Sequence, residues 1–275
     1  MAPSIDLKRG GGDTGHERMR REELRLALSS IPRGARVLEI GGGSGFQAAL
    51  LAAEGCEVVS IDVAQKPSPE HQGFQKQYWP VESYDGRRLP FGDGEFDVVY
   101  SSHMLLHVLD TMPQFLAEVR RVLRPGGLTL HVVPSASWRW WTNVLYYFDL
   151  LRRIGAKLAR RSRPAAGDRP GNTGGAAPVP VAARINLLLW PEPVGPSRNT
   201  IVEIIAFRRS RWAAAFRQAG YEDVKSAGSA VFYSGFLFLP DLPLTTRRWM
   251  AKLLGSSSHL IAARRPKARA AQPPR

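Results

Sequence analysis

The chain has 275 residues, 44% of them hydrophobic, which is enough to bury one sizeable core or a core with a small cap. Its single cysteine, Cys56, excludes an internal disulfide bond and fits a reducing compartment. A polar first 20 residues and the lack of a run of about 18 uncharged apolar residues predict a cytoplasmic protein without a spanning helix. The formal net charge of +14 favours acidic partners, such as nucleic acid, anionic lipid or an acidic substrate.

The N-terminal segment divides into a tail and a helix. Residues 1–14 are rich in glycine and polar residues, and we expect them to be disordered. Residues 16–30 show helical periodicity and predict a helix that precedes the first strand. Pro32 and Gly34 would end it.

A strand, a glycine-rich turn, a helix and a second strand follow over residues 37–62. The apolar run at 37–40 predicts a buried strand, residues 46–53 a helix, and residues 58–61 a second strand that ends in Asp62. The turn contains Gly41, Gly43 and Gly45, which allow the backbone to approach a ligand closely. An acid at the end of the second strand can hold the two hydroxyls of a ribose, so this unit is typical of a nucleoside-binding site.

The spacing of the glycines bears on which nucleoside is bound. Dinucleotide-binding proteins have G-x-G-x-x-G, whereas here Glu39, Gly41, Gly43 and Gly45 alternate with single residues. A pyrophosphate would be repelled by Glu39, but a group that carries an ammonium would tolerate it. The pattern therefore favours a nucleoside cofactor without a pyrophosphate.

Three further motifs follow in chain order. Residues 84–91 read YDGRRLPF, and residues 96–108 read FDVVYSSHMLLHV, which predicts a strand followed by two histidines. A helix at 115–123 leads through the turn at 124–127 into a strand at 128–133. With the glycine turn, these motifs resemble class I S-adenosylmethionine-dependent methyltransferases of the small-molecule type 11 family over residues 35–134.

The resemblance implies a role for individual residues. The glycines of the turn would wrap the methionine part of S-adenosylmethionine, Glu39 would support its amino group, and Asp62 would bind the ribose. Asp85 would receive the adenine amino group, with Gly86 giving close backbone access. The floor under the sulfonium would be formed by Ser101, Ser102 and His103. Gly42 stands where the family commonly has cysteine and Gly86 where it has alanine, and neither change is expected to impair binding.

The remainder of the chain departs from regular strand and helix alternation. Apolar residues at helical spacing predict a helix over 138–161, with aromatic residues in its first half and basic residues in its second. We expect a flexible loop at 162–182 and irregular or extended structure at 183–207. The last part predicts a helix at 208–220, a strand at 221–226, and a final hairpin with a helix at 245–254 and an antiparallel strand at 259–263.

These elements predict an α/β, Rossmann-like fold with a seven-stranded, mostly parallel sheet and helices on both faces. Residues 15–134 would form the S-adenosylmethionine-binding core, and residues 208–264 the C-terminal part of the sheet. Residues 135–207 would be an insertion after the fifth strand that caps the acceptor, because ligands bind at the carboxyl ends of the strands. Residues 265–275 would be a basic, disordered tail.

Methyl transfer to a hydroxyl needs a base, and two histidines follow the fourth strand. His107 is the first candidate and His103 the second, although either could serve only to pack or to bind backbone. His131, inside the fifth strand, is expected in the core. The six histidines lack metal-ligand spacing with carboxylates, so we expect no metal.

The acceptor is expected to be a small or lipid-linked molecule, methylated at oxygen. The aromatic and basic helix at 138–161 favours a peripheral position on an anionic membrane, with packing over the substrate pocket as the alternative. A nucleic-acid (RNA) methyltransferase remains open because of the basic charge, although Ser101-Ser102-His103 differs from the motif that holds a flipped base. A non-catalytic cofactor-binding partner subunit also remains open.

Overall fold

The structure is a computed structural model that describes residues 14–63, 77–161, 191–235 and 242–267, without the side chains of 157–161. The tails predicted at 1–14 and 265–275 therefore lie mostly outside the described residues, and the loop predicted at 162–182 lies wholly outside them. Arg265 itself continues the main-chain pairing, since its N–H donates to Gly127 and its carbonyl accepts from Gly126.

Seven strands of the described chain form one sheet in the order β3-β2-β1-β4-β5-β7-β6. The pairs from β3 to β5 are parallel, and β7 pairs antiparallel with both β5 and β6. The predicted antiparallel last strand is confirmed. The strands are β1 (Arg36–Ile40), β2 (Glu57–Val63), β3 (Glu82–Tyr84), β4 (Phe96–Ser102), β5 (Leu123–Pro134), β6 (Glu222–Gly228) and β7 (Ser258–Arg264).

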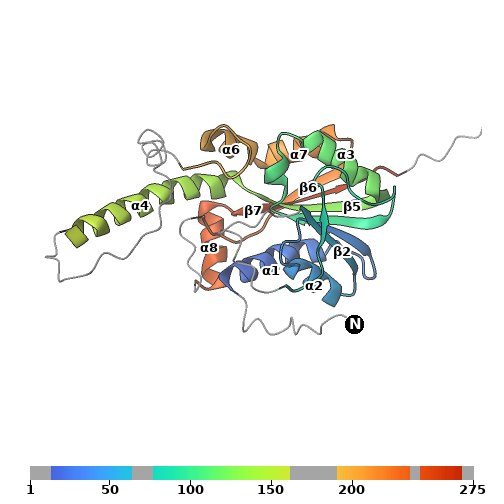
Figure 1. Cartoon of the computed structure of the whole chain (residues 1–275), viewed down its shortest axis with the longest axis horizontal. Helices are drawn as coiled ribbons and strands as arrows, with labels where there is room; N and C mark the ends of the chain where they lie inside the picture. Colours follow the sequence, from blue (N-terminus) through green and yellow to red (C-terminus); the bar gives the residue numbers. More distant parts are fainter. Residues whose placement is uncertain (1–13, 64–76, 162–190, 236–241, 268–275) are drawn as a thin grey trace, which may run out of the picture.

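Helices cover both faces of the sheet (Figure 1). α1 (Gly15–Leu28) and α2 (Phe46–Ala53) pack on one face, and α3 (Met112–Val122) and α7 (Arg209–Gln218) on the other. Neighbouring residues of β4 divide between the two cores, since Val98 joins the cluster under α1 and α2 and Val99 the cluster under α3. The doubly covered sheet explains why its central strands are apolar runs without alternation. The predicted fold class is confirmed.

Local sequence signals set the ends of several helices. Thr14 and Glu17 form a reciprocal capping box at the start of α1. Pro113 stands in the first turn of α3, where its missing N–H costs nothing. The turn predicted at 124–127 is an irregularity inside β5, because Leu123 pairs with Phe96 and Leu128 already pairs with Val98.

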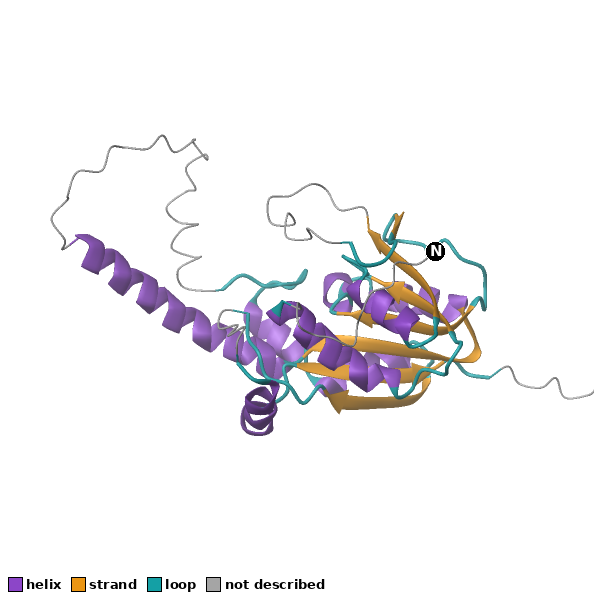
Figure 2. Cartoon of the chain, turned by 90° about the horizontal axis from the view of Figure 1, so that it is seen from below, coloured by secondary structure: helices purple, strands orange, loops and turns teal. Residues whose placement is uncertain are grey.

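The insertion begins with α4 (Ala136–Arg161), a 26-residue helix that extends well beyond the body of the molecule (Figures 1 and 2). Only its first turns pack on the body, where Arg139 forms a buried ion pair of 2.8 Å with Glu203. The expectation of irregular or extended structure up to residue 207 is wrong at its end. α6 (Thr200–Ala206) forms there because the Asn199 side chain caps the N–H of Val202.

The C-terminal region differs from the predicted hairpin. α8 (Leu244–Leu254) lies between the last two strands, as expected. Among the described residues from 229 onward, only β7 pairs in the sheet, and residues 229–235 run without strand pairing. Their main chain bonds instead to the start of β7 and the residue before it: the N–H of Ser229 donates to the carbonyl of Ser258, and the N–H of Ser257 donates to the carbonyl of Val231.

Candidate functional site

The glycine turn lies at the carboxyl end of β1. Gly41, Gly43 and Gly45 have φ values of 80°, 54° and 72°, in the left-handed region that favours glycine. The N–H groups of Gly41 and Gly42 both donate to the carbonyl of Ile61 in β2, at 2.8 and 3.2 Å. A Cβ on Gly41 would lie 3.0 Å from the Cβ of Met104, so the segment after β4 crosses directly against the turn.

Asp62 joins β2 to this turn. One carboxylate oxygen accepts the N–H of Gly43 at 2.9 Å, and the other accepts the N–H of Val63 at 2.7 Å. The predicted glycine and acid positions therefore meet at one edge of the sheet. Each carboxylate oxygen has lone-pair sites left after one backbone hydrogen bond, which suits binding of two adjacent hydroxyls.

Asp85 and Gly86 stand beyond β3 at the same edge. An oxygen of Asp85 accepts the N–H groups of Arg87 and Arg88, at 2.8 and 3.1 Å, and these bonds hold the pKa of the exposed carboxyl below its usual range. Gly86 has a φ of 74°, and a Cβ there would lie 2.8 Å from Val63. A cavity of about 450 Å³ adjoins this turn; its lining includes Tyr84, Asp85, Arg88, Leu89 and Phe91.

Glu39 is buried under the turn rather than open to it. Its carboxyl accepts the Ser60 hydroxyl at 2.6 Å, and burial raises its pKa to about 7 although this hydrogen bond opposes the rise. A Cβ on Gly42 would overlap Ser60 Oγ. In this chain Ser60 occupies space beside Gly42, which explains why glycine stands where the family commonly has a larger residue.

The end of β4 carries Ser101 and Ser102. The Ser101 hydroxyl lies 2.6 Å from Nδ1 of His131, deep in the sheet, and burial lowers the pKa of that histidine to about 3. The Ser102 hydroxyl accepts from Arg20 of α1 at 3.4 Å. His131 is therefore a neutral residue of the core, as expected, and its Nδ1 forms a hydrogen bond with the Ser101 hydroxyl.

The two candidate bases differ in their surroundings. His107 lies in a 3₁₀-helix, η2 (Leu105–Val108), where burial lowers its pKa against the opposing charge of Asp62. His103 has a φ of 55°, and its Nε2 lies 3.1 Å from Glu23 of α1. Burial and the Arg20 charge lower the pKa of His103, against the attraction of Glu23. Both histidines are therefore neutral at pH 7.

Sequence reasoning missed the residues around His103. Glu23 and Arg20 lie in the charged run of α1, which reads as a solvated helix face, yet Glu23 is fully buried. Tyr233 lies in the segment after β6, and its hydroxyl donates to Glu23 at 2.7 Å. No local sequence pattern indicates this cluster, because Glu23 is 80 residues from His103 and 210 residues from Tyr233.

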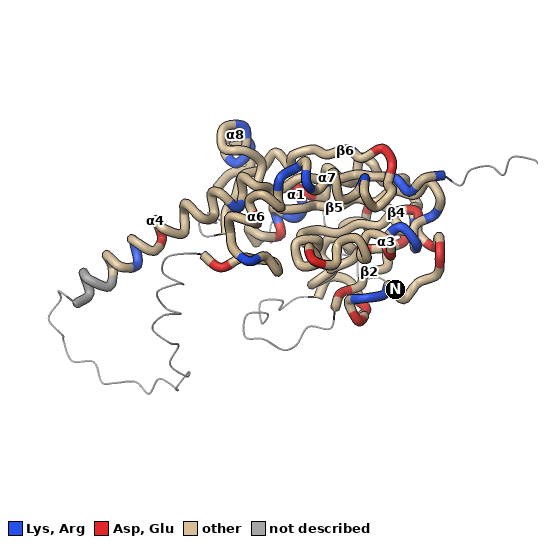
Figure 3. Tube along the Cα trace, turned by 90° about the horizontal axis from the view of Figure 1, so that it is seen from above, with Lys and Arg blue, Asp and Glu red and all other residues tan. Residues whose placement is uncertain are grey.

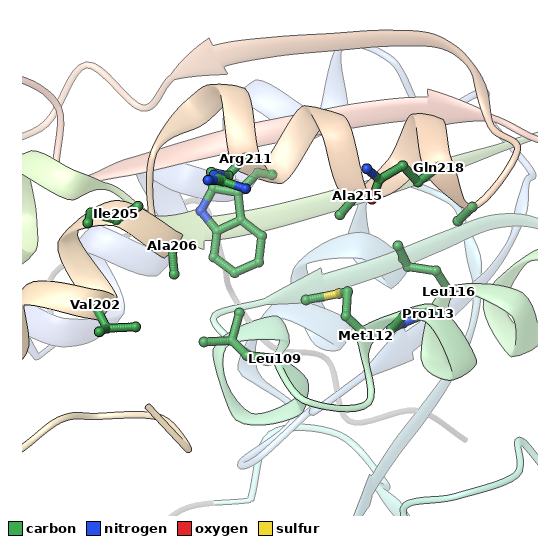
Figure 4. A pocket seen from close by; sticks show the side chains of 12 residues that line it. Leu109, Met112, Pro113, Leu116, Val202, Ile205, Ala206, Arg211, Ala215 and Gln218 are labelled. Atoms are coloured by element: carbon green, nitrogen blue, oxygen red, sulfur yellow. The ribbon is translucent and has the colours of Figure 1, made fainter. Parts of the chain in front are cut away.

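A second cavity, also about 450 Å³, lies between α3, α6 and α7 (Figure 4). Its lining is mainly apolar and includes Leu109, Met112, Leu116, Val202, Ile205 and Trp212, with Arg211 among the wall residues. Leu109, one of the lining residues, follows η2 directly and is two residues after His107 in the sequence.

The strand order, the glycine turn at the first strand and the acid at the second define a class I S-adenosylmethionine-dependent methyltransferase. The residues fit this cofactor, since the turn has no Cβ at its closest approaches and Asp62 offers two oxygens for a ribose. When bound, S-adenosylmethionine supplies an electrophilic methyl group on its sulfonium. No cluster of three or more metal-ligating side chains occurs in the part of the chain that the structure describes.

Comparison with known proteins agrees with this class. The family model described as a methyltransferase domain matches residues 38–131. The chain is 34% identical over 196 residues to an uncharacterized methyltransferase of Mycobacterium sp. strain KMS, covering 68% of this chain and 71% of that protein. It is 31% identical over 212 residues to a protein of the same strain named demethylmenaquinone methyltransferase, covering 77% and 84%. The chain belongs to the type 11 family of S-adenosylmethionine-dependent methyltransferases.

A solved structure shares the fold at low identity. A methyltransferase of Haloferax volcanii, solved with its activator protein, matches with a TM-score of 0.51 and 18% identity. The match covers 93% of each chain.

Proposed function

We propose that this methyltransferase transfers a methyl group to an oxygen of a small or lipid-linked acceptor. The observation that carries the proposal is the pair of neutral histidines after β4: His103 precedes and His107 follows Met104, which lies against Gly41 of the turn, and His107 is influenced by the charge of Asp62. A neutral imidazole can accept the proton of a hydroxyl during direct displacement at the methyl carbon. The relative named demethylmenaquinone methyltransferase supports a small, apolar acceptor and does not bear on which atom is methylated.

The insertion at 135–207 would cap the acceptor. Its described part supports this role at two points. A Cβ on Gly195 would overlap the carbonyl of Leu106, so the segment before α6 lies directly against η2 and its His107. The apolar cavity between α3, α6 and α7 includes Leu109, the residue after η2, in its wall and offers room for an apolar part of the acceptor.

The cap would also place the enzyme on an anionic membrane. Trp140, Val144, Phe148, Leu151 and Ile154 follow each other at spacings of three or four residues, which is one helix face, and all are exposed. Arg152 and Arg153 lie on the same helix, where both pair with Asp149 (Figure 3). The whole chain carries a net charge of +14, which favours an anionic surface. No helix of the described residues is long and apolar enough to cross a membrane.

The transfer reaction is tested with tritiated S-adenosylmethionine and two probes, 1,4-dihydroxynaphthalene in vesicles and total RNA. We expect label in the naphthalene product as an oxygen-linked methyl group. Label at carbon would refute the oxygen assignment, and label only in RNA would establish the nucleic-acid alternative. Cofactor binding without transfer to either probe would refute the acceptor class.

Membrane binding is tested by co-sedimentation with phosphatidylcholine vesicles that contain 30 mol % phosphatidylglycerol, roughly a biological density of anionic lipid. Phe148 and Leu151 are 63% and 68% exposed, so burying both contributes about 2–4 kcal/mol and Phe148→Ser/Leu151→Ser should weaken binding about 100-fold. The matched control is Leu253→Ser in α8, where the leucine is 64% exposed. Equal binding of wild type and double variant would refute the role of α4.

A further inference from the structure

A buried hydrogen-bond cluster lies on the α1 side of His103. Glu23 is at its centre, with 0% exposure, and one carboxylate oxygen accepts from the Tyr233 hydroxyl at 2.7 Å and the Ser258 hydroxyl at 2.6 Å. His103 Nε2 lies 3.1 Å from the same oxygen. The other oxygen forms an ion pair of 2.8 Å with Arg20. Three other parts of the chain, at His103, Tyr233 and Ser258, thus converge with α1 on one carboxylate.

This cluster fixes a histidine that the backbone already holds in an uncommon conformation. His103 has a φ of 55°, a region that residues with a side chain rarely adopt. Its N–H donates to the carbonyl of Val132 at 2.8 Å, which ties the bend to β5. Backbone strain of this kind persists where the surroundings enforce it, and it concentrates at functional sites.

The hydrogen bonds also determine where the proton of His103 lies. Burial opposes ionisation of Glu23, but the neighbouring His103 ring, the charge of Arg20 and the hydrogen bonds from His103 and Ser258 outweigh it, so the pKa of Glu23 lies below its usual range. An ionised carboxylate can only accept hydrogen bonds, and the Tyr233 hydroxyl uses its hydrogen to donate to Glu23. Nε2 of a neutral His103 must therefore carry the ring proton, which leaves the lone pair on Nδ1.

His107 has no comparable arrangement. Within the described residues, the ring nitrogens of His107 form no hydrogen bond, whereas Nε2 of His103 is held by Glu23. Nδ1 of His103 has no hydrogen-bond partner among those residues, and 15% of the side chain is exposed. A base needs both a free lone pair and a fixed orientation, and His103 meets these conditions better.

We propose that Glu23 is a positioning residue that holds neutral His103 with its proton on Nε2, so that Nδ1 is the base for the acceptor hydroxyl. The inference rests on the oxygen methylation proposed above. As the acceptor oxygen bonds to the methyl carbon, the carbon–sulfur bond breaks and its electron pair stays on sulfur. The hydroxyl proton moves to Nδ1, and the imidazolium that forms is stabilised by Glu23 and later releases this proton to water.

Other charged groups face His103 and enter its titration. Arg20 and His16 of α1 and His107 of η2 disfavour the imidazolium, whereas Glu23 favours it. Tyr233 adds a neutral hydroxyl 3.3 Å from Nε2. Because Glu23 is the acidic group in contact with the ring, Glu23→Gln should lower the pKa of His103 further.

The positioning is tested by nitrogen NMR of histidine-labelled protein, with His103 assigned from the His103→Asn spectrum. We expect neutral His103 to be protonated on Nε2 in the wild type and to populate both neutral tautomers in Glu23→Gln, with a lower pKa. The matched control is Glu22→Gln, which makes the same change one residue earlier on the same helix at a carboxylate paired with Arg25 and Arg248. A proton on Nδ1 in the wild type, or identical wild-type and Glu23→Gln spectra, would overturn the inference.

The consequence for the reaction is measured as methyl transfer to 1,4-dihydroxynaphthalene. We expect His103→Asn to lower kcat by about 10²–10⁴ and Glu23→Gln by at least about tenfold, without a change in KM for S-adenosylmethionine. Glu23→Asp, which keeps the charge on a shorter side chain, should give an intermediate rate and covers the case that Glu23→Gln does not fold. Loss of transfer in His107→Asn but not in His103→Asn would overturn the assignment. If the wild type binds the cofactor but leaves this probe unmethylated, the proposed acceptor class fails, and the NMR result decides the positioning separately.

Discussion

The contact between Gly42 and Ser60 gives a prediction that can be worked through from the structure. Gly42 lies outside the left-handed region, so its backbone would accept alanine. The obstacle is space, because the new Cβ would overlap Ser60 Oγ and lie 2.9 Å from an oxygen of Glu39. Gly42→Ala must therefore displace either the serine or the glycine turn.

The expected cost has two parts. Overfilling a packed site typically costs about 1–3 kcal/mol. If Ser60 rotates away, the buried Glu39 carboxyl also loses its hydrogen bond of 2.6 Å, which costs about 1–3 kcal/mol. Rotation of Ser60 relieves part of the overfilling, so the two costs do not add in full. We therefore expect Gly42→Ala to lower the free energy of unfolding by about 2–4 kcal/mol.

The matched experiment is a double-mutant cycle with Ser60→Ala, measured by urea denaturation of the cofactor-free protein. The Cβ of Ser60 lies 3.4 Å from the new methyl group, so removing the serine hydroxyl removes the overlap with Ser60. The 2.9 Å contact with Glu39 remains, but the end of that side chain is then no longer held by the Ser60 hydroxyl and can shift. Gly42→Ala should then cost less than about 1 kcal/mol in the Ser60→Ala background, against about 2–4 kcal/mol in the wild-type background. Equal costs in both backgrounds would show that Ser60 does not limit the residue at 42 and would refute the reasoning.

Three further predictions concern single acidic groups. Asp62→Ala should weaken S-adenosylmethionine binding at least about 100-fold by calorimetry, because the two hydrogen bonds that we expect from the ribose hydroxyls to the Asp62 carboxylate are lost. The control Asp93→Ala, at an exposed aspartate, should leave binding unchanged. The pKa of Glu39 is raised to about 7, so the folded state holds the Glu39 proton more tightly than the unfolded chain does, and the free energy of unfolding should fall by about 3 kcal/mol as the pH rises from 4.5 through 7. In urea denaturation at a series of pH values, Glu39→Gln should remove this pH dependence of stability. An unchanged pH dependence in Glu39→Gln would refute the assignment to Glu39. Glu203→Gln should lower the free energy of unfolding by about 3–5 kcal/mol by leaving Arg139 buried without its counter-charge, and Arg139→Met/Glu203→Leu should recover most of it; equal loss in both variants would contradict this.

The meeting of the glycine turn with Asp62 could be predicted because the signals for both are local. The turn needs glycine at 41, 43 and 45 for reasons of backbone geometry, and the structure gives all three positive φ values. Asp62 follows its strand directly, and a parallel neighbour brings it to the turn at 2.9 Å. A short stretch of sequence therefore contains both the residues and the geometry that joins them.

The insertion could be predicted only in part, for a reason of length. The 26 residues of α4 carry enough periodicity to identify a helix, whereas the seven of α6 do not. What stabilises α6 is the cap from Asn199 and the ion pair between Glu203 and Arg139, which are 64 residues apart. A short helix held by such a contact has no signature in its own sequence.

The cluster around Glu23 could not be predicted from the sequence, because the sequence does not show which of Glu22 and Glu23 contacts His103, Tyr233 and Ser258. Glu22 and Glu23 are adjacent and chemically identical, and both are buried in the folded chain. Glu22 pairs with two arginines that are 61% and 50% exposed, whereas Glu23 receives donors from Tyr233, Ser258 and His103. An exposed ion pair contributes little and can be lost cheaply, but a buried carboxylate with four partners is retained only if each partner is in place. The residue proposed to position the base is thus defined by the assembled fold, while the turn proposed to bind the cofactor is defined by its own sequence.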